Sequence, residues 1–364
     1  MKILLLVLTL ISQNAFSRLQ FEDATSPELL TSARALAMGN SYASLVDDSA
    51  AAFYNPAGLG TVRGLKLDLA HIHFELNNGF LDVTGGSGNF FESIEKYDDA
   101  FQSDGVRSLL ADNPGNSTHA RVNLFPNITY RWITLGYMYS QQQKARLASQ
   151  NADFEIAERQ DSGPVLAAAF SLFGGVIKFG ATATYLTRRE IFRDTPANVQ
   201  TDIKKEDYSR AEMTHIVAST RITFPVRLIP AISVVSRNIG SNQWYSEDLA
   251  GAPDEIPETT DVAFSITPFT GKGSRLHIEI GRKDIANKYE DVPDSRKLQG
   301  GIEWNYRRKI FVRAGYGDGW GSGGFGIKGR RFTFDLSTYA IEQSLDGFRE
   351  EEDRRYAINI ASGF

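Results

Sequence analysis

The chain closes with Tyr356-Ala357-Ile358-Asn359-Ile360-Ala361-Ser362-Gly363-Phe364, and this stretch decides the fold. Its large apolar side chains recur at alternate positions between small or polar residues, which predicts a β-strand with one apolar face. That face continues to an aromatic residue at the end of the sequence. Such an ending is typical of outer-membrane β-barrels of Gram-negative bacteria. We therefore expect the barrel assembly machinery to bind a signal formed by Tyr356, Ile358, Ile360 and Phe364.

The start of the chain predicts export. Lys2 precedes an apolar run from Ile3 to Ile11, and the small-residue site Ala15-Phe16-Ser17 follows, as in a secretory signal peptide. The run is too short to cross a bilayer as a helix, for which roughly 20 residues are needed. We expect residues 1–17 to be removed and the mature protein to reside in the cell outer membrane.

Composition excludes several other classes of protein. With 39 Lys and Arg against 44 Asp and Glu, the net charge is −5, so no nucleic-acid partner is expected. The absence of cysteine excludes disulfides, a lipid-anchored N-terminal cysteine and Cys-based metal sites. Beyond the signal peptide no apolar stretch is long enough for a spanning helix. Any insertion into a membrane must therefore occur through β-strands, in which only every second residue faces lipid.

The residues from 65 onward carry that pattern. Segments of about ten residues alternate apolar and polar positions, as transmembrane strands do, and we count about fourteen of them. The clearest is Leu298–Tyr306, in which Ile302 is expected to face lipid and Glu303 the lumen, so that Ile302→Arg should cost more than Glu303→Arg. By the same alternation, Ile278, Phe334 and Ile358 also face lipid. The side chains expected to line the lumen are His277, Glu279, Glu303, Asn305, Asp335 and Asn359.

The turns alternate in length, which is the pattern of bacterial barrels with short periplasmic turns and long external loops. One short connection, Gly317 to Gly321, falls on the long-loop side and predicts a low hairpin there or a misplaced strand boundary. The alternative fold is a soluble β-sandwich or β-helix with half-exposed strands. The short turns are expected at 131–132, 173–175, 224–226, 270–273, 307–308 and 329–330, and the long loops at 75–120, 148–159, 194–206, 240–257, 286–294 and 343–353.

The segment 18–64 lacks any strand pattern and is rich in Ala, Gly and Ser. A barrel of about 14 strands encloses a lumen too wide to be filled by the side chains of its own wall. Small residues allow close backbone packing, so we expect this segment to form a hatch inside the lumen of the barrel at 65–364. Asp47 or Asp48 is expected to cap a short helix through Phe53 and Tyr54, which Pro56 ends.

Three stretches of this segment resemble a known family. They are 32–39 (SARALAMG), 45–50 (LVDDSA) and 53–59 (FYNPAGL), and they resemble the N-terminal hatch of the FadL superfamily, including its Asn-Pro-Ala motif. Members are 14-stranded outer-membrane barrels plugged by this hatch; they transport long-chain fatty acids or aromatic hydrocarbons, or serve type IX secretion. The motif Ala-Arg-Ala-x-Ala-Met-Gly (residues 33–39) is similar to the one found in the secretion-associated branch of the superfamily. The resemblance covers roughly residues 30 to 60.

By that resemblance, a change of hatch conformation opens a route for a hydrophobic ligand toward the periplasm or sideways through the wall. The alternative is that the Asn55-Pro56-Ala57 turn only anchors the hatch. The residues expected to contact a ligand, or merely to pack in the hatch, are Phe53, Tyr54, Asn55, Pro56 and Ala57.

Other clusters do not support catalysis or metal binding. His71 and His73 point to one face of their strand, but no third ligand lies nearby in the sequence, so no metal and no cofactor is expected. Acidic loop runs such as Glu350–Asp353 are solvated charges, or bridge to lipopolysaccharide through divalent ions. No nucleophile-elbow motif is present, and we expect no enzymatic activity.

Three functions remain open. A transporter of fatty-acid-like hydrophobic molecules predicts an apolar site beside the hatch. A partner or shuttle barrel for protein secretion, or a purely structural barrel, predicts ordered external loops that bind protein. An open porin predicts ion conductance. All three place the protein in contact with outer-membrane lipid and lipopolysaccharide.

Overall fold

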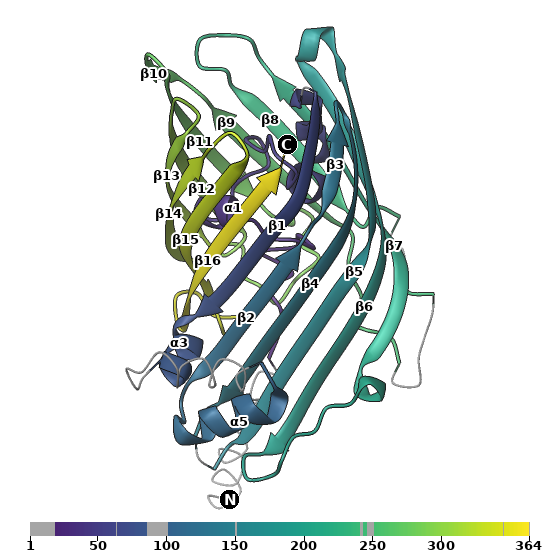
Figure 1. Ribbon diagram of the computed structural model, residues 1–364, viewed down its shortest axis with the longest axis vertical. Helices are drawn as coiled ribbons and strands as arrows, with labels where there is room; N and C mark the ends of the chain where they lie inside the picture. The colour runs from purple at the N-terminus through teal and green to yellow at the C-terminus, as the bar shows by residue number, and fades with distance from the viewer. Residues whose placement is uncertain are drawn as a thin grey trace, which may run out of the picture.

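The computed structural model is a closed antiparallel β-barrel (Figure 1). It describes residues 19–62, 64–85, 101–149, 151–240, 243–245, 251–344 and 346–363. The expected signal peptide and Phe364 therefore lie outside the described residues. No helix in these ranges is long and apolar enough to cross a membrane.

Fourteen strands make up the wall. There are sixteen strand segments, but β2 and β3 both lie between β1 and β4, and β9 and β10 both pair with β11, so each of these two pairs is one interrupted strand. β1 pairs with β16, with Ile72 opposite Ile360, and this closes the barrel. The segments are β1 (Leu65–Asn77), β2 (Ser117–Leu124), β3 (Asn127–Tyr130), β4 (Ile133–Leu147), β5 (Asp153–Leu172), β6 (Ile177–Pro196), β7 (Ser209–Thr223), β8 (Ala231–Arg237), β9 (Thr259–Ile266), β10 (Phe269–Gly271), β11 (Ser274–Arg282), β12 (Leu298–Tyr306), β13 (Ile310–Gly317), β14 (Trp320–Lys328), β15 (Phe332–Glu342) and β16 (Glu352–Gly363).

The two rims differ as the turn lengths predict. The short-turn rim carries the connections after β3, β5, β7, β10, β12 and β14, and the long-loop rim carries the others. The exception at Gly317 is a tight hairpin, since Asp318 and Gly319 both have positive φ and β14 begins at Trp320. The expected loop at 148–159 is wrong, because β5 already begins at Asp153.

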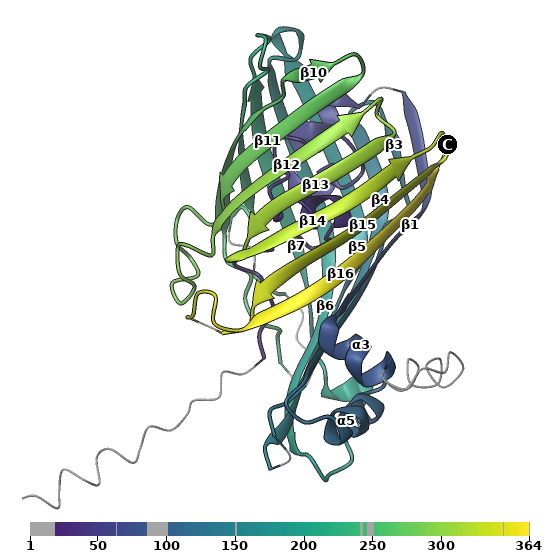
Figure 2. The same cartoon turned by 90° about the vertical axis from the view of Figure 1, so that its left-hand side faces the viewer.

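Residues 153–159 form a strand because β5 continues beyond the main wall of the barrel. The far ends of β4, β5 and β6 form a sheet extension, and α5 (Ser103–Asp112) packs on it beside α3 (Asn78–Gly85) (Figure 2). Val106 and Leu110 of α5 share a buried apolar cluster with Leu147, Phe154 and Ile156. The charged residues between these apolar positions gave the segment the composition of a loop.

The side chains of the wall alternate between two environments. In β12, Ile302 is 45% exposed on the outer surface, whereas Glu303 is 1% exposed. The same contrast separates Ile358 from Asn359 in β16. Tyr356 and Ile360 also lie on the outer surface, on the face of β16 that carries Ile358.

Candidate functional site

Residues 19–62 lie inside the barrel and contact its wall; this segment is the hatch (Figure 1). It contains two short helices, α1 (Ala33–Leu36) and α2 (Ala51–Tyr54), followed by the 3-10 helix η1 (Pro56–Thr61). Asp48 accepts a hydrogen bond from the Ala50 backbone nitrogen at the start of α2 (3.1 Å), whereas Asp47 pairs with Arg34.

Glycines of the wall let the hatch backbone approach it directly. A Cβ placed on Gly315 of β13 would lie 2.1 Å from the Met38 backbone, and one on Gly317 would lie 2.3 Å from the backbone oxygen of Gly39. Gly39 itself has a φ of 64°, a conformation that glycine adopts without strain. The small residues of the hatch and the glycines of β13 therefore form one close-packed seam.

Charges join the hatch to the same side of the wall. Arg34 forms two hydrogen bonds with Glu303, Nε to Oε2 at 2.8 Å and Nη2 to Oε1 at 2.9 Å. Glu303 also accepts from Arg313 Nε (2.7 Å), and Arg313 Nη1 donates to Asp335 (2.6 Å). Because Glu303 is the shared acceptor of two arginines, it is the centre of this cluster.

A second charged contact lies elsewhere on the wall. Glu28 of the hatch accepts a hydrogen bond from Arg237 Nη2 (2.8 Å) and pairs with Lys283, and Asp261 pairs with both cations. All four side chains are at most 7% exposed. Such a buried network is costly to break, since losing one partner leaves another charge unpaired.

The start of the hatch is held at the long-loop rim. Glu22 accepts from Arg355 Nη2 (2.8 Å) and pairs with Lys144, while Asp23 binds Arg159 (2.7 Å). Burial alone raises the pKa of Glu22, but the charges of Arg355 and Lys144 outweigh it and hold this pKa well below its ordinary value.

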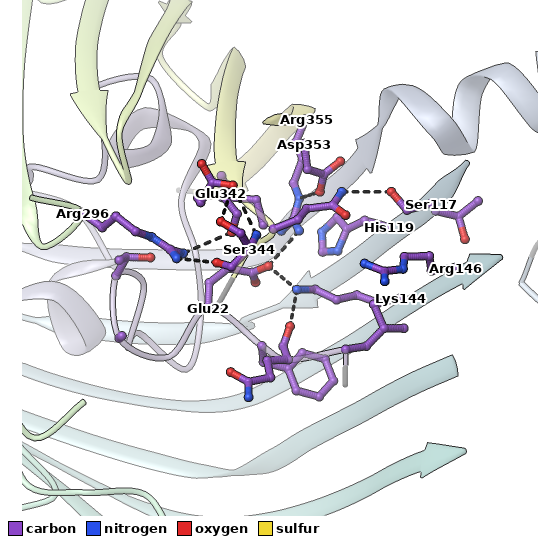
Figure 3. A pocket seen from close by; sticks show the side chains of 18 of the residues that line it. Glu22, Ser117, His119, Lys144, Arg146, Arg296, Glu342, Ser344, Asp353 and Arg355 are labelled. Atoms are coloured by element: carbon purple, nitrogen blue, oxygen red, sulfur yellow. Dashed lines mark hydrogen bonds and ion pairs between the residues drawn. The ribbon is translucent and has the colours of Figure 1, made fainter. Parts of the chain in front are cut away.

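A small cavity lined by several charged side chains lies at this rim. It measures about 80 Å³ and lies between the start of the hatch and the ends of β2, β4 and β16. Figure 3 shows Glu22, Lys144, His119, Arg355 and Asp353 around it. Its size and charge are unsuited to a hydrophobic guest.

The Asn55-Pro56-Ala57 turn rests on the opposite side of the lumen. Asn55 is fully buried; its Nδ2 donates to the Ala43 oxygen (2.5 Å) and its Oδ1 accepts from the Ala57 nitrogen (3.0 Å). The Ala57 nitrogen also donates to Ser219 Oγ of β7 (2.9 Å). A Cβ on Gly180 of β6 would lie 2.2 Å from the Pro56 carbonyl carbon, so only glycine fits beneath the turn.

Phe53 and Tyr54 pack within the protein in this conformation. The Phe53 ring meets Phe125 edge to face, with 4.9 Å between centroids. The Tyr54 hydroxyl donates to Asn40 Oδ1 (2.9 Å), and its ring packs against Tyr42 (5.4 Å). Neither side chain faces a large open cavity among the described residues.

Part of the wall beside this turn is apolar toward the lumen. Buried hydrophobic residues of four neighbouring strands pack against hatch residues such as Leu59 and Val62 in one cluster. We call these wall residues the apolar band; they are Met138 of β4, Val165 and Ala167 of β5, Leu186 of β6 and Met213 of β7.

The residues expected to line the lumen occupy the charged side. His277 contacts Thr267 (2.7 Å) and Glu279 (3.2 Å), and Glu279 accepts from the Ser44 nitrogen of the hatch (3.1 Å). Asn359 is buried in β16, whereas Asn305 is half-buried beside a turn and accepts from the Arg308 nitrogen (2.8 Å). Glu303 and Asp335 belong to the cluster around Arg313.

Sequence reasoning missed the partners of these residues. Arg34 and Glu28 were not singled out, because nothing in a single sequence links them to partners more than two hundred residues away. Arg313 was not singled out either, although Glu303 lies only ten residues from it. Gly180 and Ser219, which seat the Asn-Pro-Ala turn, gave no signal beyond strand alternation. His71 contacts Ser49 (3.0 Å), His73 contacts Glu75, and no group of metal ligands occurs among the described residues.

Solved structures share this architecture. CymD, a monoaromatic hydrocarbon channel, superposes with a TM-score of 0.52 at 11% identity over 91% of this chain and 96% of that chain. The chain has the FadL-type barrel fold. The expected fold class is therefore confirmed, and at this identity the likeness concerns the fold alone.

Two further structures are similar at lower scores. The P. putida toluene transporter TodX has a TM-score of 0.46 at 8% identity, with 93% and 96% of the two chains covered. CdiB from Acinetobacter baumannii has a TM-score of 0.37 at 9% identity over 83% of this chain, which spans 60% of the length of that protein. No protein-family model matches the sequence. No curated protein matches it either.

Proposed function

We propose that this protein is an outer-membrane channel that passes hydrophobic small molecules when its hatch moves away from the apolar band. One observation carries the proposal: the two sides of the lumen differ in chemistry. Ion pairs such as that of Arg34 with Glu303 fasten the hatch on the side of β11–β16. On the side of β4–β7 the ion pairs are those of Glu22 and Asp23 at the long-loop rim, and beyond that rim Leu59 and Val62 of the hatch pack against the apolar band. The fold of a hydrocarbon channel such as CymD supports the same function.

The energetics favour a hydrophobic guest on the apolar side. Separating the hatch from Val165 or Met213 exposes apolar surface, at roughly 25 cal/mol per Å² when water enters. A hydrophobic molecule that enters instead covers this surface and removes most of that cost. On the charged side, the same displacement would separate Arg34 from Glu303 and Glu28 from Arg237 and Lys283, and breaking such buried pairs costs several kcal/mol.

A reversible cross-link tests whether the hatch must move. The Oγ atoms of Ser44 in the hatch and Ser233 in β8 lie 2.9 Å apart, so cysteines at both positions are placed to form a disulfide in a chain that has no other cysteine. We expect uptake of a fluorescent hydrophobic probe by whole cells to fall on oxidation of Ser44→Cys/Ser233→Cys and to recover on reduction. Each single variant is the matched control.

Uptake that is the same in oxidised, reduced and null strains would refute the transport function. In that case a second candidate takes precedence, a partner barrel for protein secretion. The observation that favours it is the rigid external platform formed by β4, β5 and α5, whose buried cluster fixes Val106 and Leu110 against the sheet. Crosslinking from the exposed face of α5 in intact cells would then capture a protein partner.

The remaining associations follow from the proposed location. We propose that the outer surface contacts outer-membrane lipid, that the loops of the long-loop rim contact lipopolysaccharide, and that the last strand engages the barrel assembly machinery through Tyr356, Ile358, Ile360 and Phe364. No catalytic role and no cofactor is assigned to the hatch or the wall.

A further inference from the structure

Two cations of the lumen lack the partners that all comparable residues have. Among the described residues, every buried Lys or Arg except Lys178 forms an ion pair with a carboxylate. Lys178 of β6 is 8% exposed and has no ion pair or hydrogen bond from its amine in the described chain. Directly opposite it in β7 stands Arg221, whose Nε and Nη1 atoms are shielded from solvent and unbonded.

This pair is unfavourable without an anion. Two like charges directly opposite each other on one face of a strand pair repel, and shielded guanidinium nitrogens lose their bonds to water without replacement. No carboxylate of the described residues forms an ion pair with either cation, and Glu279 and Asp47 act on Arg221 only from a longer distance. The nearest part of the hatch is Gly60, on which a Cβ would lie 3.1 Å from Lys178 Cδ. An oxyanion between Lys178 and Arg221 would satisfy both groups.

The cations stand next to a groove at the short-turn rim. The groove has a volume of about 470 Å³ and lies between the turn after β5 and the turn after β7. The Thr223 nitrogen, two residues beyond Arg221, donates to the Val176 oxygen (2.8 Å), and both residues line the groove. A Cβ on Gly175 would lie 4.0 Å from Lys178 Cε, so the lysine stem ends at the groove wall.

The lining of the groove is mostly apolar. Val176, Pro225, Val226, Ile229 and Phe269 line it, and Arg227 is an exposed cation among them. The groove therefore offers an apolar surface beside a pair of unneutralised cations, which is the complement of an amphiphile.

We propose that Lys178 and Arg221 bind the oxyanion head group of an amphiphile, a carboxylate or a phosphate, whose apolar chain lies in this groove. In barrels of this kind the short-turn rim faces the periplasm, so the site is where such a molecule leaves the lumen or where an anionic lipid of the inner leaflet docks. If the ligand is a transported molecule that leaves the lumen, the inference rests on the proposed function, because it names the chemistry of the transported compound.

Binding to the purified full-length protein in neutral detergent tests the site. The probes are dodecanoate, dodecyl phosphate and the uncharged dodecanol, with acetate to represent the head group alone. We expect wild type to bind dodecanoate on the order of tenfold more tightly than dodecanol, and Lys178→Gln/Arg221→Gln to lose that preference while its dodecanol affinity is unchanged.

A control variant separates the site from the general charge of the rim. Arg308→Gln/Arg330→Gln removes two exposed cations from the turns after β12 and β14 of the same rim, neither of which lines the groove, and this variant should bind dodecanoate as wild type does. Since Lys178 and Arg221 make no ion pair, Lys178→Gln/Arg221→Gln should fold and unfold at no lower denaturant concentration than wild type. Equal dodecanoate affinity of wild type and this double variant would overturn the proposal, as would equal loss in the control variant.

Nanodiscs distinguish the two sources of the ligand. If membrane lipid occupies the site, phosphatidylglycerol in the disc should weaken dodecanoate binding to wild type but not to Lys178→Gln/Arg221→Gln. If a transported amphiphile occupies it, dodecanoate affinity should be the same in neutral and anionic discs. If oxidation of Ser44→Cys/Ser233→Cys does not change uptake while dodecanoate binding still depends on Lys178 and Arg221, transport is refuted but this site is not. If oxidation blocks uptake while dodecanoate binding does not depend on these two residues, only this site is refuted.

Discussion

Glu303→Ala should loosen the hatch more than any other single truncation in the lumen. Glu303 accepts two hydrogen bonds from Arg34 and one from Arg313, and its side chain is 2% exposed. Its loss leaves Arg34 with Asp47 and, at 3.4 Å, Asp48, whose side chains are 57% and 32% exposed, and leaves Arg313 with Asp335 alone.

The magnitude follows from these residual partners. Removing one member of a buried ion pair costs about 3 to 5 kcal/mol, because the other charge stays buried without compensation. Since Arg34 keeps Asp47 and Asp48 and Arg313 keeps Asp335, we expect a loss at the lower end of this range, about 3 kcal/mol, in the free energy of unfolding. Arg34→Ala/Glu303→Ala should be less destabilised than the sum of the two single variants, by about 1 to 3 kcal/mol.

The assay is equilibrium unfolding in urea of the refolded barrel, followed by tryptophan fluorescence, together with proteolysis of the hatch in native membranes. Glu303→Gln keeps the shape of the side chain and one acceptor oxygen, so it should lose less stability than Glu303→Ala. A cost below about 1 kcal/mol for Glu303→Ala, or strict additivity with Arg34→Ala, would refute the role of this cluster as the hatch anchor.

Four further outcomes are expected. Ile302→Arg should cost about 2 to 4 kcal/mol in urea unfolding if residue 302 lies near the bilayer midplane, and a cost near zero would contradict the outward facing of that position. The pKa of Glu22 is depressed in the folded state, so Glu22 holds the start of the hatch fully above the ordinary pKa of 4.5 and releases it as pH falls through the lower folded pKa. Hydrogen exchange of residues 19–25 should show this release, and Glu22→Gln should abolish its pH dependence. Gly315→Val should displace Met38 and raise leakage of small polar solutes into cells, whereas Gly321→Val, at a position with nothing within 4 Å, should not. Deletion of Phe364 should lower surface levels of the protein, and normal levels would argue against the terminal signal.

The fold could be predicted from the sequence because the alternation of apolar and polar residues along a strand is a local pattern. The alternation of Ile302 with Glu303, or of Ile358 with Asn359, needs only neighbouring residues to be recognised, and the turn lengths set the topology. The extension of β4 and β5 was not accessible, since Phe154 and Ile156 are covered by Leu110 and its neighbours on a separate helix.

The candidate site was only partly accessible for the same reason. Glu303 is buried, and its engagement by Arg34 depends on how a non-repetitive hatch folds inside the wall. For that reason we now expect Glu303→Arg to be as damaging as Ile302→Arg, although for a different cause: it places three arginines together in a buried cluster.

The division of the lumen also bears on the order of events during opening. Contacts of the apolar band, such as Leu59 with its neighbours in β4–β7, are non-directional, so a hydrophobic guest replaces them with little loss. The bonds of Arg34 and Glu28 require fixed partners, and no hydrophobic guest replaces those. If the proposed transport function holds, we expect the hatch to leave the apolar band first and to turn about the bonds of Arg34 and Glu28. Under that proposal a hydrophobic molecule favours opening because it covers the exposed apolar surface, whereas water does not.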